Sequence, residues 1–173
     1  NPSAPANCHP DPLSSSPPTM AALPPQLKLE SEDILFYISC CERLNCNVLI
    51  PVVEFLASTR VESSSPSSAP HPSALNDSVL RLDGVSDSEL ESVCAVLSRV
   101  NTAFASSPSP SSSTPLSRLE LFRGTFSTLG VSALSSFLEN DRCLQALRLH
   151  ECPIGDTGAL GLAEALIRNS QVL

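Results

Sequence analysis

Positive charge is scarce in this sequence, which carries ten lysines and arginines against eighteen aspartates and glutamates. The resulting net charge of −8 repels the phosphate backbone of nucleic acids at long range, so we expect no nucleic-acid partner. Long apolar runs are also absent, because none reaches the ~18 residues that a membrane-spanning helix needs. The first residues lack the charged and apolar regions of a signal peptide. These absences predict a cytoplasmic protein that makes no contact with a membrane.

The sequence patterns of catalytic and metal sites are missing as well. There is no glycine-rich phosphate-binding loop, no paired acidic constellation and no metal-binding helix motif. The seven cysteines are odd in number and irregularly spaced, which argues against a disulfide framework and favours a reducing compartment. Cys40, Cys41 and Cys46 lack the paired spacing of zinc ligands and are interpreted as small buried apolar residues. His150 and Cys152 lack an orienting third group, so we expect no catalytic residue, metal or cofactor.

Proline and serine divide the chain into ordered and disordered parts. Eight of the sixteen prolines fall within residues 1–25, which have no periodic apolar pattern and are predicted to be disordered. Two further serine- and proline-rich stretches, near residues 60–74 and 103–115, are predicted to be loop inserts. The cost of closing a loop grows slowly with its length, so these inserts are compatible with one domain over residues 26–173.

Within this domain, strand-like alternation is followed by helical spacing. Leu80 and Leu82 alternate as in a strand, and the apolar residues of the segment 90–97 then recur at three- and four-residue intervals. Asp87 or Ser88 is expected to cap that helix. A strand followed closely by a helix is therefore the predicted unit of the fold.

The start of the domain allows two interpretations. Residues 33–40 are rich in β-branched and aromatic residues, which favours a half-buried strand. The alternative is one helix that is capped by Ser31 and runs through Leu44. Residues 49–56 have helical spacing in either case, with Pro51 tolerated only near the first turn.

The C-terminal half contains two copies of one pattern. Leu147 and Leu149 alternate as in a strand, and Leu162, Ala165 and Leu166 follow at helical spacing. A shift of 28 residues aligns this copy with the preceding stretch: Leu116, Leu119, Leu121, Phe126, Gly130, Leu134 and Leu138 fall on Leu144, Leu147, Leu149, Ile154, Gly158, Leu162 and Leu166. This agreement indicates an internal repeat, and about four units are expected in total. One strand and one helix cannot bury their own apolar edges, so the units must stack.

The unit resembles the leucine-rich repeat of the ribonuclease-inhibitor subfamily. Leu144, Leu147, Leu149, Cys152 and Ile154 reproduce the strand-and-turn pattern of that family, and the 28-residue period with a helix is typical of the subfamily. The resemblance implies an α/β solenoid with parallel strands on its concave face and helices on its convex face. Because another strand pattern begins at the last residues, we expect the repeats to continue beyond residue 173.

Three glycines of the repeats have expected roles. Gly124 stands where the family prefers Cys or Asn, so its turn is expected to lack the side chain that normally bonds the local backbone. Gly130 and Gly158 are expected to form the turns through which the chain enters its helices.

The resemblance also implies a binding surface. Residues that alternate with the strand leucines would face the concave side, which is the usual binding face of such solenoids. They are Arg81, Asp83, Glu120, Phe122, Arg123, Arg148, His150 and Glu151. An exposed Phe122 among charges of both signs favours a protein interface. The alternative is a solvated sheet face that binds nothing.

These expectations lead to a non-catalytic scaffold whose partner is another protein. Two narrower functions are implied by family analogy alone. One is a regulator of an enzyme, similar to a Ran-type small-GTPase activator or to ribonuclease inhibitor. The other is the sensing repeat region of a nucleotide-binding leucine-rich-repeat receptor. The sequence does not determine the oligomeric state.

Overall fold

The computed structural model describes residues 31–59, 78–106 and 115–169. It contains α1 (Glu32–Leu44), α2 (Ile50–Ser58), β1 (Val79–Asp83), α3 (Asp87–Ser106), β2 (Arg118–Phe122), α4 (Thr128–Asn140), β3 (Ala146–His150) and α5 (Gly155–Arg168). The predicted α/β class is confirmed. The predicted disordered segment 1–25 and the insert near 60–74 lie outside the described residues. The insert predicted near 103–115 begins too early, because residues 103–106 belong to α3, and residues 107–114 lie outside the described residues.

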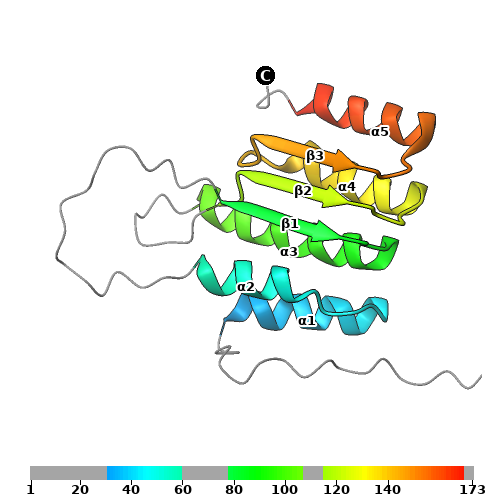
Figure 1. Cartoon of the computed structure of the whole chain (residues 1–173). Helices are drawn as coiled ribbons and strands as arrows, with labels where there is room; N and C mark the ends of the chain where they lie inside the picture. Colours follow the sequence, from blue (N-terminus) through cyan, green and yellow to red (C-terminus); the bar gives the residue numbers. More distant parts are fainter. Residues whose placement is uncertain (1–30, 60–77, 107–114, 170–173) are drawn as a thin grey trace, which may run out of the picture.

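The three strands form one parallel sheet in the order β1-β2-β3 (Figure 1). Leu119 pairs with Leu147 on one side and with Leu80 on the other, so the strand leucines lie in register across the sheet. The expected pairing of leucines 28 residues apart is therefore confirmed. Leu80 and Leu119 are 2% and 0% exposed, and burying each such side chain contributes roughly 1.5–3 kcal/mol.

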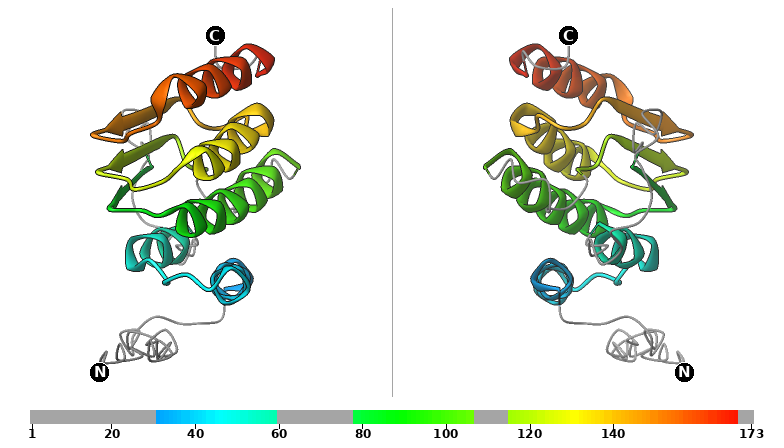
Figure 2. Two further views of the ribbon diagram at one scale, coloured as in Figure 1. Left: turned by 90° about the vertical axis from the view of Figure 1, so that its right-hand side faces the viewer. Right: turned by 90° about the vertical axis from the view of Figure 1, so that its left-hand side faces the viewer.

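Helices α3, α4 and α5 lie side by side against one face of the sheet (Figure 2). Each follows its strand directly, which gives three strand-helix units: β1-α3, β2-α4 and β3-α5. The predicted apolar face of α3 is confirmed, with Leu90 and Leu97 both fully buried. The predicted face of α5 is only partly buried, because Leu162 is covered whereas Leu166 is 39% exposed. Among the described helices, α4 packs closely against α5, and Leu166 stays partly uncovered.

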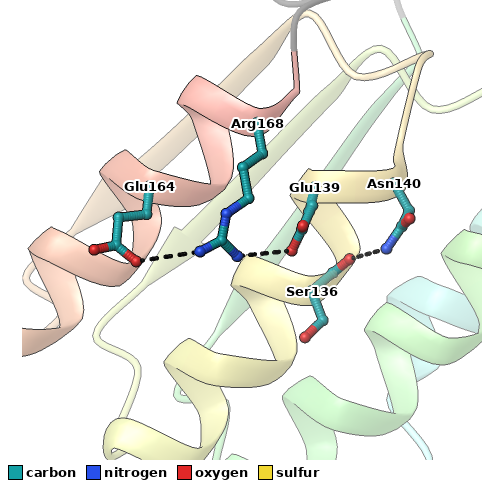
Figure 3. A network of polar contacts seen from close by, with 5 residues as sticks. All are labelled: Ser136, Glu139, Asn140, Glu164 and Arg168. Carbon is teal, nitrogen blue, oxygen red and sulfur yellow. Dashed lines mark hydrogen bonds and ion pairs between the residues drawn. The ribbon is translucent and has the colours of Figure 1, made fainter.

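An exposed ion-pair network also joins α4 to α5. Arg168 on α5 lies 3.5 Å from Glu139 on α4 and 3.6 Å from Glu164 one turn earlier in α5 (Figure 3). Asn140 donates a 2.9 Å side-chain hydrogen bond to the carbonyl of Ser136 beside this pair. Exposed pairs of this kind contribute about 0–1 kcal/mol each, so the packing of the two helices depends mainly on their apolar contacts.

The strand expected over residues 33–40 was wrong, and the alternative helix is correct. Ile34, Tyr37, Ile38 and Cys41 are buried on one side of α1, at the spacing of a helical face. This face packs against α3, and that contact overrides the strand preference of the β-branched and aromatic residues. Ser31 does occupy the cap position, but its side chain makes no capping hydrogen bond.

Helices α1 and α2 together cover the β1 end of the sheet (Figure 1). Helix α1 ends at Asn45, whose left-handed backbone (φ 50°) lets the Cys46 N–H reach the Cys41 carbonyl at 3.0 Å. The buried hydroxyl of Tyr37 then accepts a 3.1 Å hydrogen bond from the Leu49 N–H. These bonds direct the chain into α2. Helix α2 packs against β1 and covers that edge of the sheet, whose backbone groups would otherwise be open to pairing with another strand.

The start of α3 is capped differently from the prediction. Neither Asp87 nor Ser88 occupies the cap position; Ser86 does, since its carbonyl accepts the first helical hydrogen bond, from Leu90. Glu89 accepts hydrogen bonds from the N–H and hydroxyl of Ser86 at 2.9 and 2.7 Å, as in a capping box. Asp87 instead turns toward the next unit, where it accepts hydrogen bonds from two N–H groups at the start of α4.

A buried polar ladder, formed by Asn101, Asp141 and Asn169, bonds the backbone just before β2 and β3. Asn101, near the end of α3, accepts a 3.3 Å hydrogen bond from the Leu116 N–H, and Asp141 after α4 accepts one from the Leu144 N–H at 2.6 Å. The Asn101 amide donates to Asp141, and the Asn169 amide donates to the Asp141 carbonyl. The three residues occupy equivalent positions in successive units, so they tie each helix end to the next layer.

The glycine expectations need correction. Gly130 and Gly158 lie inside α4 and α5 rather than in the preceding turns, and both allow close packing between units. A Cβ at Gly158 would lie 3.3 Å from Val131. Gly124 does lack a bonding side chain, as expected, whereas the equivalent Cys152 thiol lies 3.6 Å from the Leu121 carbonyl. The space at Gly124 is filled by Phe126, whose ring lies 2.2 Å from an ideal Cβ position.

We therefore expect Gly124→Ala to destabilise the fold by about 1–3 kcal/mol, because the Phe126 ring is buried and cannot move aside without displacing the core. Gly161→Ala is the matched control. Its Cβ would meet only Ser135 at 3.7 Å, and alanine favours the helix by up to about 1 kcal/mol. Urea denaturation measures both free energies of unfolding. Equal stabilities of Gly124→Ala and the wild type would show that Phe126 does not occupy this space.

Candidate functional site

The sheet has an outer face, on the side opposite α3, α4 and α5 (Figure 2). Residues two apart on a strand share a face of the sheet. The strand register aligns six of the eight predicted residues in two rows across the outer face. The arginine row consists of Arg81, Glu120 and Arg148, and the aromatic row consists of Asp83, Phe122 and His150. Arg123 and Glu151 do not lie on the strands, because each follows the end of its strand.

The arginine row is built around one buried carboxylate. Glu120 has a side chain that is only 3% exposed, and both of its oxygens are bound. Arg81 Nε lies 2.8 Å from one oxygen, and Arg148 Nη1 lies 3.2 Å from the other. The two arginine side chains remain 70% and 56% exposed. A carboxylate buried in this way requires such partners, because an unpaired buried charge is costly.

The aromatic row contains a stacked pair of rings. The centroids of Phe122 and His150 lie 4.6 Å apart, with 4° between the ring planes. The spacing matches that of adjacent strands, so the sheet itself sets the stack. His150 is exposed, whereas Phe122, which was expected to be exposed, is half-buried because its ring stacks on His150. This pair offers an aromatic surface directly beside the arginine row.

Arg123 and Asp83 form the third feature of the outer face. Arg123 has a left-handed backbone (φ 48°), in the position that Gly84 (φ 66°) occupies one unit earlier and Glu151 (φ 54°) one unit later. This conformation lets the Arg123 N–H bond the His150 carbonyl at 2.8 Å. Its side chain binds Asp83 through two nitrogens, with Nε at 2.9 Å from the carboxylate.

The hydrogen bonds from Arg123 hold the pKa of the Asp83 carboxyl below its ordinary value of 3.8. The same contacts raise the pKa of Arg123, to which the charge of Glu151 also contributes. Glu151 therefore affects the outer face through Arg123 rather than from a strand position. All eight predicted residues belong to one contiguous region, but only six of them lie in the rows.

The described cysteines differ in exposure. Cys40 and Cys41 are buried as predicted, whereas Cys46 is only half-buried, and burial raises the pKa of the Cys41 thiol to about 11. Such thiols are poor nucleophiles at neutral pH. The Cys152 sulfur contacts the His150 carbonyl at 3.4 Å, so the hydrogen bonds of this thiol go to backbone oxygens. No cluster of three or more His, Cys, Asp or Glu side chains within the described ranges could hold a metal ion.

No protein-family model matches this chain, and no curated protein matches it. None of the described helices combines the length and apolarity that crossing a bilayer requires.

The role of Glu120 was missed from the sequence. It was predicted to be one of several exposed charges on the face, whereas it is the buried centre of the arginine row. The signal was present in the 28-residue repeat, which places Arg148 opposite Glu120 on the neighbouring strand. The partner on the other side, Arg81, lies 39 residues before Glu120, so the repeat length alone did not reveal it.

Replacing Arg123 tests the ion pair directly. We expect Arg123→Gln to raise the pKa of Asp83 toward 3.8, because the charged hydrogen bonds are lost. A carboxyl whose pKa is lower in the folded than in the unfolded chain stabilises the fold at pH values above the unfolded-state pKa. This contribution is lost as the pH falls through the folded-state pKa. The variant should therefore lose less stability than the wild type on acidification. Carboxyl NMR titration of Asp83 measures the shift, with Arg168→Gln as the control, and an unchanged Asp83 titration in Arg123→Gln would contradict this pairing.

Proposed function

We infer that the chain forms a leucine-rich-repeat solenoid that binds another protein through the outer face and carries out no catalysis. Support for the repeat comes from the three strand-helix units, whose leucines pair at a 28-residue offset between β2 and β3. The N-terminal helix pair supports it further, since repeat arrays need an end structure that covers the first layer. In such a solenoid the outer face is the concave binding surface.

The observation that carries the binding function is the composition of the two rows. Interfaces favour arginine and aromatic side chains that are held rigidly and remain accessible. Arg81 and Arg148 are fixed through Glu120, and His150 is fixed on Phe122, yet these arginines and the histidine stay exposed. Side chains that are already ordered lose less conformational entropy on binding. The same pairs also neutralise the buried Glu120 charge, so the support for binding comes from the exposure of the arginines and the histidine.

The narrower alternatives would use the same surface. A regulator of an enzyme and the sensing region of a receptor would both present these rows to another protein, and no described residue favours one of them. The cytoplasmic location and the absence of nucleic-acid and membrane partners likewise remain predictions from the sequence.

Photo-crosslinking tests the proposed surface. We expect benzoylphenylalanine at position 122, in the full chain, to crosslink a partner at least about tenfold more strongly than the same probe at position 132, because hot-spot contacts cluster at an interface centre. Ser132 is exposed on α4, on the opposite side of the molecule, and serves as the control position. Mass spectrometry quantifies the crosslinked proteins in a lysate of the source cells. The same proteins in equal amounts from both positions would rule out the outer face.

A further inference from the structure

We propose that the outer face recognises an extended protein segment in which one acidic residue and one aromatic residue stand two positions apart. This inference rests on the proposed function and adds the chemistry of the partner. The acidic side chain would bind the arginine row, and the aromatic side chain would bind the aromatic row.

The arginine row has spare capacity for an anion. Each guanidinium has five N–H donors, and Glu120 engages Arg81 through Nε and Arg148 through Nη1. The row contains two positive charges and one negative charge, and the negative one is covered by the arginines. Both guanidinium groups approach the same carboxylate, Arg81 from β1 and Arg148 from β3. An incoming carboxylate therefore meets hydrogen-bond donors rather than Glu120.

The other charges of the face do not compete for this carboxylate. Arg123 is already neutralised by Asp83, which it binds through two nitrogens. The net charge of −8 disfavours a strongly acidic partner at long range. A single acidic residue among neutral neighbours keeps the short-range attraction and avoids most of that repulsion. The partner is therefore a mildly charged segment, not an acidic tract.

The aromatic row fixes the second feature of the partner. Phe122 and His150 stack at 4.6 Å, and His150 is exposed whereas Phe122 is half-buried. An aromatic side chain of the partner would pack on the accessible edges of these two rings, an edge-to-face contact worth a measurable gain beyond burial alone.

The spacing between the rows fixes the third feature. The rows are two residues apart on each strand, which corresponds to about 7 Å along the strand direction. In an extended partner segment that lies along the strands, side chains two positions apart have the same separation and point to the same side. The acidic and aromatic residues of the partner must therefore be at positions i and i+2.

Labelled seven-residue peptides test the inference by fluorescence anisotropy with the full chain. The probe is Gly-Ser-Glu-Ser-Trp-Ser-Gly. Its controls replace Glu with Gln, replace Trp with Ala, or separate Glu and Trp by three residues. We expect each change to weaken binding about tenfold, as for the loss of a charge-assisted hydrogen bond or a stacked ring.

Variants of the chain test whether peptide binding becomes tighter or weaker when the charges of the arginine row are changed. Glu120→Gln removes the buried charge but keeps the shape and both arginines, so the Glu peptide should bind about threefold more tightly. Adding Arg81→Gln and Arg148→Gln to that background removes the positive charge without leaving a buried carboxylate unpaired, and binding should be lost. Arg168→Gln on α5 should change nothing. Circular dichroism confirms that each variant is folded. If the arginines only neutralise Glu120, the Glu120→Gln variant will not bind more tightly.

The two proposals fail in different ways. Equal binding of the Glu and Gln peptides, or no binding of any peptide at concentrations up to ~1 mM, overturns the inference about the partner. If position 122 still crosslinks a protein selectively, the proposed binding face survives that result. If position 122 crosslinks nothing selectively either, both proposals are wrong.

Discussion

The core, the order of the layers and the outer face all follow from the parallel pairing of β1, β2 and β3 in one register. It stacks Leu119 on Leu80 and on Leu147, and the same alignment places α3, α4 and α5 side by side. A slip of one residue in any strand would turn its leucines outward and its charged residues into the core. The strand register is therefore strongly specified wherever neighbouring layers bury these leucines.

The register that builds the core also builds the outer face. Glu120 can be buried because the paired positions on both neighbouring strands are arginines. The rings of Phe122 and His150 stack because they occupy paired positions one strand apart. Asp87 and the buried polar ladder reinforce the same alignment from the helix side, since each joins one unit to the next. Stability and the proposed recognition thus share one geometric origin.

The strands and the helical faces could be predicted because each depends on local periodicity. The first helix was misjudged because residues 33–40 favour a strand locally, and only the contact with α3 decides against it. Asp87 was expected to cap its own helix, whereas its partners lie some 40 residues further along the chain. Of the site, alternation predicted which residues share a face. The pairing of Arg81 with Glu120 depends on the length of an insert, and the repeat does not encode that length.

The register can be measured most directly by NMR contacts between β2 and β3. The pairing predicts strong cross-strand nuclear Overhauser effects between Glu120 and Arg148 and between Phe122 and His150, together with slow exchange of the Arg123 amide proton, which the His150 carbonyl accepts. Contacts at any other offset, or the i to i+3 contacts of a helix through residues 118–122, would contradict the parallel layers and with them the proposed binding face.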